Sequence, residues 1–320
     1  MTLTPQQQEK LAQIFLPNFC QQKQRVLDTK KRFVHYTNAE AAMNILRDKK
    51  IWMRNASGMN DFMEVTHGFN CLNAAYKGET GKEFNALLDA VFPGFSDRLK
   101  NLFNGWLNDL KFNTYLLCVS EHEDNEDING RLSMWRGYGS ASSVAFVLNT
   151  KVFFGEADDF GAFSSPVAYC DDAKFESEFR KIVENVKKDA SFLKTLNQDI
   201  VLGIIFQMLR IASVCTKHPG FHEEQEWRVI YSPNLFNSKY IERAHASLNG
   251  TPQTIYKIPL KDVPEIKLDG AEISKLIDRI IIGPTQYPMV MWEAFVGLLK
   301  GADVENAEGK VFVSNIPLRR

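Results

Sequence analysis

The chain has 320 residues, of which 44% are apolar and 12% aromatic, with 38 Lys and Arg against 39 Asp and Glu. This apolar content can offset the chain entropy of folding, which excludes a mainly disordered protein. A formal net charge of -1 excludes a general basic field, so nucleic-acid contact would require a local patch. The N-terminus lacks the order of a secretory signal, and no stretch approaches the roughly 20 apolar residues of a membrane helix. We therefore expect a cytoplasmic protein without a membrane partner.

The cysteines are odd in number, widely spaced and free of any C-x-x-C pair. They are Cys20, Cys71, Cys118, Cys170 and Cys215. This spacing argues against a disulfide framework and against a structural zinc site. We expect reduced thiols and no bound metal.

The first third of the chain predicts helices around two short strands. Thr4, Pro5 and Gln7 form a capping box with Pro at the first helical position, and the helix should end near Phe15. A second helix with a locally basic segment is expected over residues 21–32. Strand character at 33–36 is followed by a second capping box, Thr37 with Glu40, which predicts another helix. A short strand at 51–53 precedes a helical pattern over 64–111, broken near Gly78 and Pro93.

The rest of the chain alternates between strand groups and helices. Strands are predicted at 114–120, 143–148, 227–231, 254–258, 279–282 and 311–313, and helices at 174–216 and 289–299. Separate groups of strands with helices between them predict an α+β fold. We expect an N-terminal helical segment, 1–32, and one domain, 33–320, with helical insertions at about 64–111 and 174–216.

Several common nucleotide and hydrolase motifs are missing. No P-loop and no G-x-S-x-G elbow occurs, and the segment that begins Gly137-Tyr138-Gly139 has Ser142 in place of the third fingerprint glycine. That segment also precedes a strand instead of opening a helix, which excludes a Rossmann site.

One segment has the composition of a metal site. His218 and His222 are four residues apart and adjoin Glu223 and Glu224. A helix would place both imidazoles on one face, but Pro219 and the glycine after it make that helix improbable. A metal-dependent hydrolase or nuclease on these four side chains stays open as an alternative, with loop geometry.

A pair of carboxylates opens the strand at 227–231. Glu224 and Glu226 are two residues apart, and the alternation of a strand puts Glu226 and Arg228 on one face, with Trp227 on the other. The polar face must be exposed as an ion-pair ladder or line a polar cleft.

Three separated segments together supply the groups that would bind and cleave a nicotinamide riboside. They are His35-Tyr36-Thr37, Trp135-x-x-Tyr138 and Glu224-x-Glu226. A histidine can hydrogen-bond a ribose hydroxyl, and an aromatic ring can stack on the cationic nicotinamide. A carboxylate can hold the ribose 2′-hydroxyl and stabilise an oxocarbenium-like transition state.

These segments also carry a family resemblance. The chain resembles a bacterial family with a domain of unknown function, which in turn is similar to the ADP-ribosyltransferase superfamily, especially its His-Tyr-Glu branch. The landmarks are His35-Tyr36-Thr37, Met59 to Glu64, Cys118-Val119-Ser120, Met134 to Tyr138, Lys217 to Arg228 and Ile280 to Pro284. They span residues 33 to 284. One departure is Phe62, where the family often has proline after Asn-Asp.

The resemblance implies a split β-sheet core and a role for each matching residue. It puts His35 in the first-strand histidine role, Tyr138 in the ring-stacking role and Glu226 in the catalytic glutamate role. Glu224 would contact the acceptor, and Trp135 could stack in place of Tyr138. Tyr36 and Thr37 would complete the nicotinamide pocket.

The leading hypothesis is a transferase that moves ADP-ribose from NAD to a macromolecule, RNA or protein. The resemblance implies a toxin or anti-phage defence role and an antitoxin partner, and the basic segment 21–32 mildly favours a phosphate-bearing acceptor. The alternatives are a non-catalytic module that binds a nucleotide or a protein, the metal-dependent hydrolase, and a simple NAD glycohydrolase.

Overall fold

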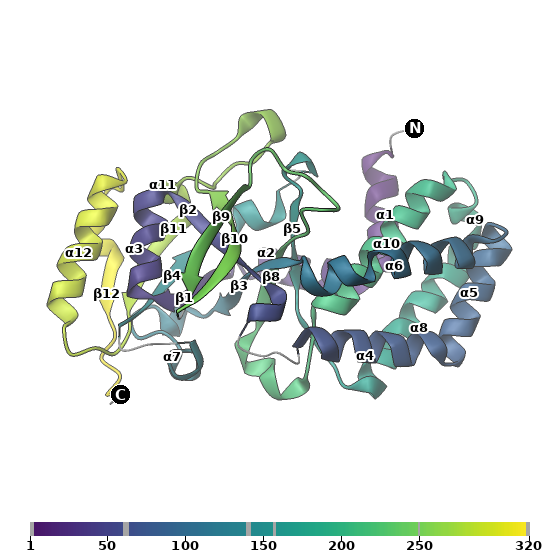
Figure 1. Cartoon of the computed structure of the whole chain (residues 1–320), viewed down its shortest axis with the longest axis horizontal. Helices are drawn as coiled ribbons and strands as arrows, with labels where there is room; N and C mark the ends of the chain where they lie inside the picture. The colour runs from purple at the N-terminus through teal and green to yellow at the C-terminus, as the bar shows by residue number, and fades with distance from the viewer. Residues whose placement is uncertain (1–2, 60–63, 139–141, 156–157, 249, 318–320) are drawn as a thin grey trace. The chain divides into compact units, whose positions relative to one another are not determined.

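The computed structural model describes residues 3–59, 64–138, 142–155, 158–248 and 250–317 (Figure 1). The chain packs into two compact units. Unit 1 comprises residues 1–25, 56–114 and 165–223, and unit 2 comprises 26–55, 115–164 and 224–320. Both units are therefore assembled from segments far apart in the sequence. Within the described residues, no helix is long and apolar enough to cross a membrane.

Unit 1 is a helical assembly. Its helices are α1 (Pro5–Phe15), α4 (Glu64–Lys77), α5 (Glu79–Val91), α6 (Phe95–Phe112), α8 (Asp172–Lys188), α9 (Ala190–Leu193) and α10 (Gln198–Val214). The predicted capping box of α1 is confirmed, with Thr4 and Gln7 bonded to each other's backbone amides. The predicted breaks after Lys77 and near Pro93 are confirmed as the ends of α4 and α5. A short parallel pair, β6 (Ala168–Tyr169) with β7 (Thr216–Lys217), completes the unit.

Helix α10 is the apolar centre of unit 1, and α1, α4 and α6 pack against it. The α4 contact is close because Gly68 has no side chain: a Cβ there would lie 2.2 Å from the carbonyl oxygen of Ser213. Aromatic rings fill the space between α5 and α8, where Phe84 and Phe179 meet edge to face with their ring centroids 5.2 Å apart.

Unit 2 holds a mostly antiparallel sheet, so the fold is mixed α+β, as expected. Its strands are β1 (Arg32–Asn38), β2 (Lys50–Asn55), β3 (Tyr115–His122), β4 (Ser143–Leu148), β5 (Ala162–Pro166), β8 (Glu226–Tyr231), β9 (Glu242–Leu248), β10 (Thr251–Pro259), β11 (Ile277–Ile282) and β12 (Val311–Val313). Their order is β12-β11-β4-β1-β3-β2-β10-β9, with β8 paired to β3 and β5. The β11–β12 pair is parallel.

The helices of unit 2 pack around this sheet. They are α3 (Ala39–Asp48), α7 (Leu132–Tyr138), α11 (Ile273–Leu276) and α12 (Pro288–Gly301), and α2 (Pro17–Asp28) ends just before β1. Helix α3 contacts β1 and β2, and α12 lies against α3 and β12 (Figure 1). The predicted cap of α3 was wrong by one residue: Asn38, not Thr37, is the N-cap, and its side chain accepts a hydrogen bond from the Ala41 amide at 2.7 Å.

The sheet opens where β1 and β2 meet β3. Ser120 pairs with Val34 of β1, and Tyr115 pairs with Asn55 of β2, while both residues also pair with β8. Because a strand has two edges, β1 and β2 share the edge of β3 that faces away from β8. Residues 117–119 of β3 lie between the stretch that pairs with β1 and the stretch that pairs with β2. The two strands therefore separate around Cys118.

Register fixes which side chains share a face, because directly opposite residues point the same way. Val34, Ser120 and Glu226 lie opposite one another across β1, β3 and β8, so they share one face. We name it the α7 face, because Trp135 of α7 packs there on Val34. The opposite face carries Trp227, whose indole contacts the Phe33 ring at 5.3 Å between centroids.

Candidate functional site

Tyr138 and Glu224 meet in space although 86 residues separate them in the chain. The Tyr138 hydroxyl donates a hydrogen bond to Oε1 of Glu224 at 2.9 Å. Tyr138 is the last residue of α7. Burial, followed by the carboxylates of Glu224 and Glu226, raises the pKa of Tyr138 far above its usual value. The phenol therefore stays protonated and acts as a donor.

Glu226 forms a buried ion pair with Arg228. Arg228 Nε donates to Oε1 of Glu226 at 2.8 Å and Nη2 donates to Oε2 at 3.1 Å. The two side chains are 7% and 1% exposed, respectively. Of the two predicted fates of this polar strand face, an exposed ladder is therefore wrong. A two-point guanidinium–carboxylate contact also fixes the orientation of the carboxylate plane.

A backbone turn separates the two carboxylates. Glu224 ends a 3-10 helix (Pro219–Glu224), Glu226 begins β8, and Gln225 between them has a φ of 45°. The two glutamates therefore do not lie side by side on one strand face. Both carboxylates nevertheless lie near the Tyr138 hydroxyl, since the charge of each raises the pKa of Tyr138.

Cys118 lies at the opening of the sheet and connects His35 to this group. His35 Nδ1 donates to the Cys118 carbonyl at 2.9 Å, which leaves Nε2 as the acceptor nitrogen. Burial lowers the pKa of His35. The Cys118 side chain lies near Tyr138 and Arg54. Ionisation of its thiol would raise the pKa of both groups.

The structure thus brings together only some of the predicted ligand-binding residues. Tyr138, Glu224 and Glu226 are brought together, whereas alternation along β1 puts His35 on the face opposite Tyr36. Thr37 shares the orientation of His35 and lies opposite Val144 of β4.

Trp135 is a core residue. Its side chain is 0% exposed and its Nε1 donates to the Asn129 carbonyl at 2.7 Å. Gly130, at a φ of 66°, lies so close that a Cβ would be 2.7 Å from the indole. Because its side chain is fully buried, the structure gives no support to the alternative in which Trp135 stacks on a ligand.

Tyr36 supports the same core and is half-buried. Its ring meets Trp135 edge to face at 4.8 Å, and its hydroxyl accepts a hydrogen bond from the Arg131 amide at 2.8 Å. Burial raises the pKa of Tyr36 well above its usual value. Its contacts place Tyr36 as a support for the α7 segment that ends in Tyr138.

The end of the basic segment 21–32 is neutralised within unit 2. Arg32 bonds Asp124 and Asp127 at 2.7 Å each and Asp278 at 2.6 Å, and Lys31 pairs with Glu123. The acidic loop that follows β3 thus binds the residues that seemed available to a phosphate. Lys31 and Arg32 give no support to a phosphate-bearing acceptor.

The histidine pair has local partners. His218 Nδ1 accepts from the Gly220 amide at 3.1 Å, and His222 Nδ1 lies 3.1 Å from the Pro219 carbonyl. No group of three or more His, Cys, Asp or Glu side chains suited to a metal ion occurs among the described residues. The metal-dependent alternative has no geometric support there.

Chemically, the group at α7 and β8 combines an aromatic donor, two carboxylates and a guanidinium. Arg228 supplies this guanidinium and Cys118 lies nearby, and the sequence analysis assigned neither residue a role in the site. For Arg228 the signal was present, since a Glu-x-Arg strand puts the two side chains on one face. Residues 139–141, which follow Tyr138, and the landmark residues 60–63 lie outside the described residues.

Comparison with known families places part of this site in a defined domain. A family described as "Protein of unknown function (DUF2971)" matches residues 134–229, so a DUF2971 domain occupies that segment. The match includes α7 with Tyr138 and extends to the Glu226–Arg228 pair. No curated protein matched the chain. No solved structure matched it either.

Proposed function

We propose that this chain transfers ADP-ribose from NAD to a macromolecular acceptor, with Glu226 as the catalytic carboxylate. The observation that supports this most is the 2.9 Å hydrogen bond from Tyr138 to Glu224, beside the Glu226–Arg228 pair. It joins an aromatic ring and a second carboxylate to Glu226 from distant parts of the chain. Such a group can bind a flat cationic ring and stabilise positive charge on an adjacent ribose.

In this proposal the Tyr138 ring stacks on nicotinamide and Glu226 accepts a hydrogen bond from the ribose 2′-hydroxyl. Arg228 contacts both carboxylate oxygens of Glu226 and so fixes the orientation in which the carboxylate would meet the ribose. Negative charge at Glu226 then stabilises the oxocarbenium character that develops at C1 of the ribose.

The bond changes are simple. The C–N bond between ribose and nicotinamide breaks, and nicotinamide leaves as a neutral molecule with the bonding electron pair. A nucleophilic oxygen or nitrogen of the acceptor attacks C1, and its proton passes to Glu224. The ribose-binding role of His35 rests on the family resemblance, with Nε2 as the acceptor atom. The acceptor is RNA or protein, and water in its place would give NAD glycohydrolase activity.

Labelled NAD, incubated with the protein and a cell extract, tests this proposal. The labelled protein, RNA and free ADP-ribose are separated, and nicotinamide release is measured. We expect Glu226→Gln to lower the release about 100-fold or more, as loss of a transition-state-stabilising group does. The control Glu242→Gln removes an exposed carboxylate on β9 that pairs with Lys50, and it should keep full activity.

Each outcome separates the alternatives. No NAD consumption by folded protein contradicts the proposal and favours a non-catalytic binding module. Label only in free ADP-ribose identifies a glycohydrolase. Equal activity of Glu226→Gln and Glu242→Gln would exclude Glu226 from catalysis, provided that circular dichroism shows both variants folded.

A further inference from the structure

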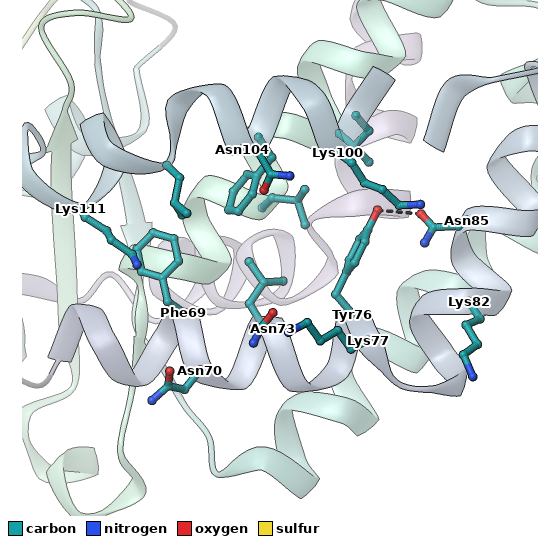
Figure 2. A pocket seen from close by; sticks show the side chains of 15 residues that line it. Phe69, Asn70, Asn73, Tyr76, Lys77, Lys82, Asn85, Lys100, Asn104 and Lys111 are labelled. Carbon is teal, nitrogen blue, oxygen red and sulfur yellow. Dashed lines mark hydrogen bonds between the residues drawn. The ribbon is translucent and has the colours of Figure 1, made fainter. Parts of the chain in front are cut away.

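A second candidate site lies entirely within unit 1, in a groove between α4 and α6. The cavity has a volume of about 640 Å³, within the range of small-molecule sites. Figure 2 shows α6 along one side, with Lys100 and Asn104, and α4 along the other, with Phe69 and Tyr76. Both helices pack against α10, which contributes Leu209 to the lining.

Helical spacing explains why the groove has a continuous lining. On α6 the lining positions Leu99, Phe103, Leu107 and Lys111 recur every four residues, so they form one stripe. On α4 the positions Phe69, Leu72, Asn73 and Tyr76 form the facing stripe at spacings of three and four.

The groove combines an apolar floor with a basic rim. Leu72, Leu99 and Leu209 are buried, whereas Tyr76 and Phe103 are half-buried and present part of their rings. Four lysines line the cavity and no Asp or Glu does; the lysines are Lys77, Lys82, Lys100 and Lys111. Positive charge above exposed aromatic surface suits a ligand that carries both an anion and a flat ring.

Among the described residues, two of the four lysines pair with carboxylates and two do not, and the second two can contact an anionic ligand. Lys82 pairs with Glu79 at 2.6 Å and Lys100 with Asp97 at 3.5 Å. In the part of the chain that the structure describes, Lys77 and Lys111 have no carboxylate partner. Lys111 instead lies over the Phe69 ring, 5.1 Å from its centroid.

Amide side chains supply directional hydrogen bonds between these charges. Asn70, Asn73 and Asn104 are exposed at the rim, and Asn85 accepts a bond from the Tyr76 hydroxyl at 2.6 Å (Figure 2). An Asn amide is both a donor and an acceptor, which matches the edge of a nucleobase. Aromatic rings stack on bases, and lysines bind phosphate.

We propose that this groove binds a nucleoside phosphate, with the base against Tyr76 and Phe103 and the phosphate at the basic rim, which Lys77 lines near Tyr76 and Lys111 lines over Phe69. The nucleotide can be free or part of a single strand, since both present the same base and phosphate. This inference is independent of the proposed transferase activity, because every lining residue belongs to unit 1.

Titration calorimetry on the full chain at low salt tests the proposal with three probes: AMP, a short single-stranded oligoribonucleotide and ribose 5-phosphate. We expect AMP or the oligonucleotide to bind, and ribose 5-phosphate, which lacks the base, to bind at least tenfold more weakly. Tighter binding of AMP identifies a free nucleotide as the ligand, and tighter binding of the oligonucleotide identifies a strand.

The matched variants are Lys77→Ala/Lys111→Ala and Lys187→Ala/Lys188→Ala. The second pair removes the same charge from exposed positions on α8, in the same unit and outside the groove. We expect about a tenfold loss of affinity for the first pair and less than a twofold change for the second. Equal affinities of the two double variants, equal binding of ribose 5-phosphate and AMP, or no binding of any probe would overturn the proposal.

Discussion

The guanidinium of Arg228 holds both carboxylate oxygens of Glu226, at 2.8 and 3.1 Å, inside unit 2. A buried pair of this kind gains from mutual attraction and loses hydration, so its two halves depend on each other. The same contact orients the carboxylate that we propose as catalytic. Stability and activity should therefore respond differently to changes in this pair.

Arg228→Met should lower the free energy of unfolding by about 3–5 kcal/mol, because it removes the two-point donor from a buried carboxylate. The double variant Glu226→Leu/Arg228→Met should recover most of that loss, since no buried charge then remains. Urea denaturation measures both. A double variant no more stable than Arg228→Met would show that the pair is not coupled as described.

Variants of Trp135 and Tyr138 should distinguish a structural role on α7 from a ligand-binding role. Trp135→Phe should lower the free energy of unfolding by about 1–3 kcal/mol, because it loses packing and the hydrogen bond to Asn129. It should leave the KM for NAD nearly unchanged. Tyr138→Leu should instead weaken NAD use, through loss of the stacking ring. Thermal melts and initial rates distinguish the two, and a raised KM with unchanged stability for Trp135→Phe would reverse the assignment.

His35 should remain neutral through mildly acidic pH. Its folded pKa is lowered by burial, so between that value and about 6.5 the unfolded chain binds more protons. The stabilisation is therefore fully present above pH 6.5 and is lost as pH falls below it, with a slope of up to about 1.4 kcal/mol per pH unit. Denaturation of the wild type and of His35→Gln between pH 5 and 8 measures this slope.

Nitrogen-detected NMR checks the same histidine directly. The Nδ1–H tautomer should be the one observed, because Nδ1 donates to the Cys118 carbonyl. An imidazolium signal from His35 in folded protein at pH 6 would contradict the expectation, as would an unchanged pH slope in His35→Gln.

Asp278 should contribute to acid sensitivity. Burial alone would raise its pKa, but hydrogen bonds from Arg279 and Arg32 outweigh burial and lower it. The resulting stabilisation is fully present above the unfolded pKa of about 3.9 and is lost as pH falls through the folded value. Asp278→Asn should therefore cost about 1 kcal/mol at pH 7 and progressively less below pH 4.

The control for Asp278 is Asp124→Asn. Asp124 also bonds Arg32, at 2.7 Å, but its side chain is 95% exposed. Exposed ion pairs contribute little, so this variant should lie within about 0.5 kcal/mol of wild type. An equal loss from both variants, measured by urea denaturation at pH 7, would contradict the dependence on burial.

The sequence by itself determined the local elements. Capping and helix breaks predicted α1, α4, α5 and α6, because these signals act within a few residues. Apolar β-rich runs predicted β3, β4, β8, β10 and β11. The sequence did not predict β9 or α7. Strand β9 has few apolar residues although its burial alternates, and α7 is too short for a helical periodicity to appear.

Only the tertiary structure decided which of these elements cooperate. The bond between Tyr138 and Glu224, the opening of the sheet at Cys118 and the groove between α4 and α6 all join residues distant in the chain. Trp135 has the sequence features of a stacking residue, yet packing buries it completely. Likewise, the net charge of -1 conceals a basic segment and an acidic loop that bind each other through Arg32, Asp124 and Asp127. Long-range contacts depend on strand register and helix packing, which no local pattern specifies.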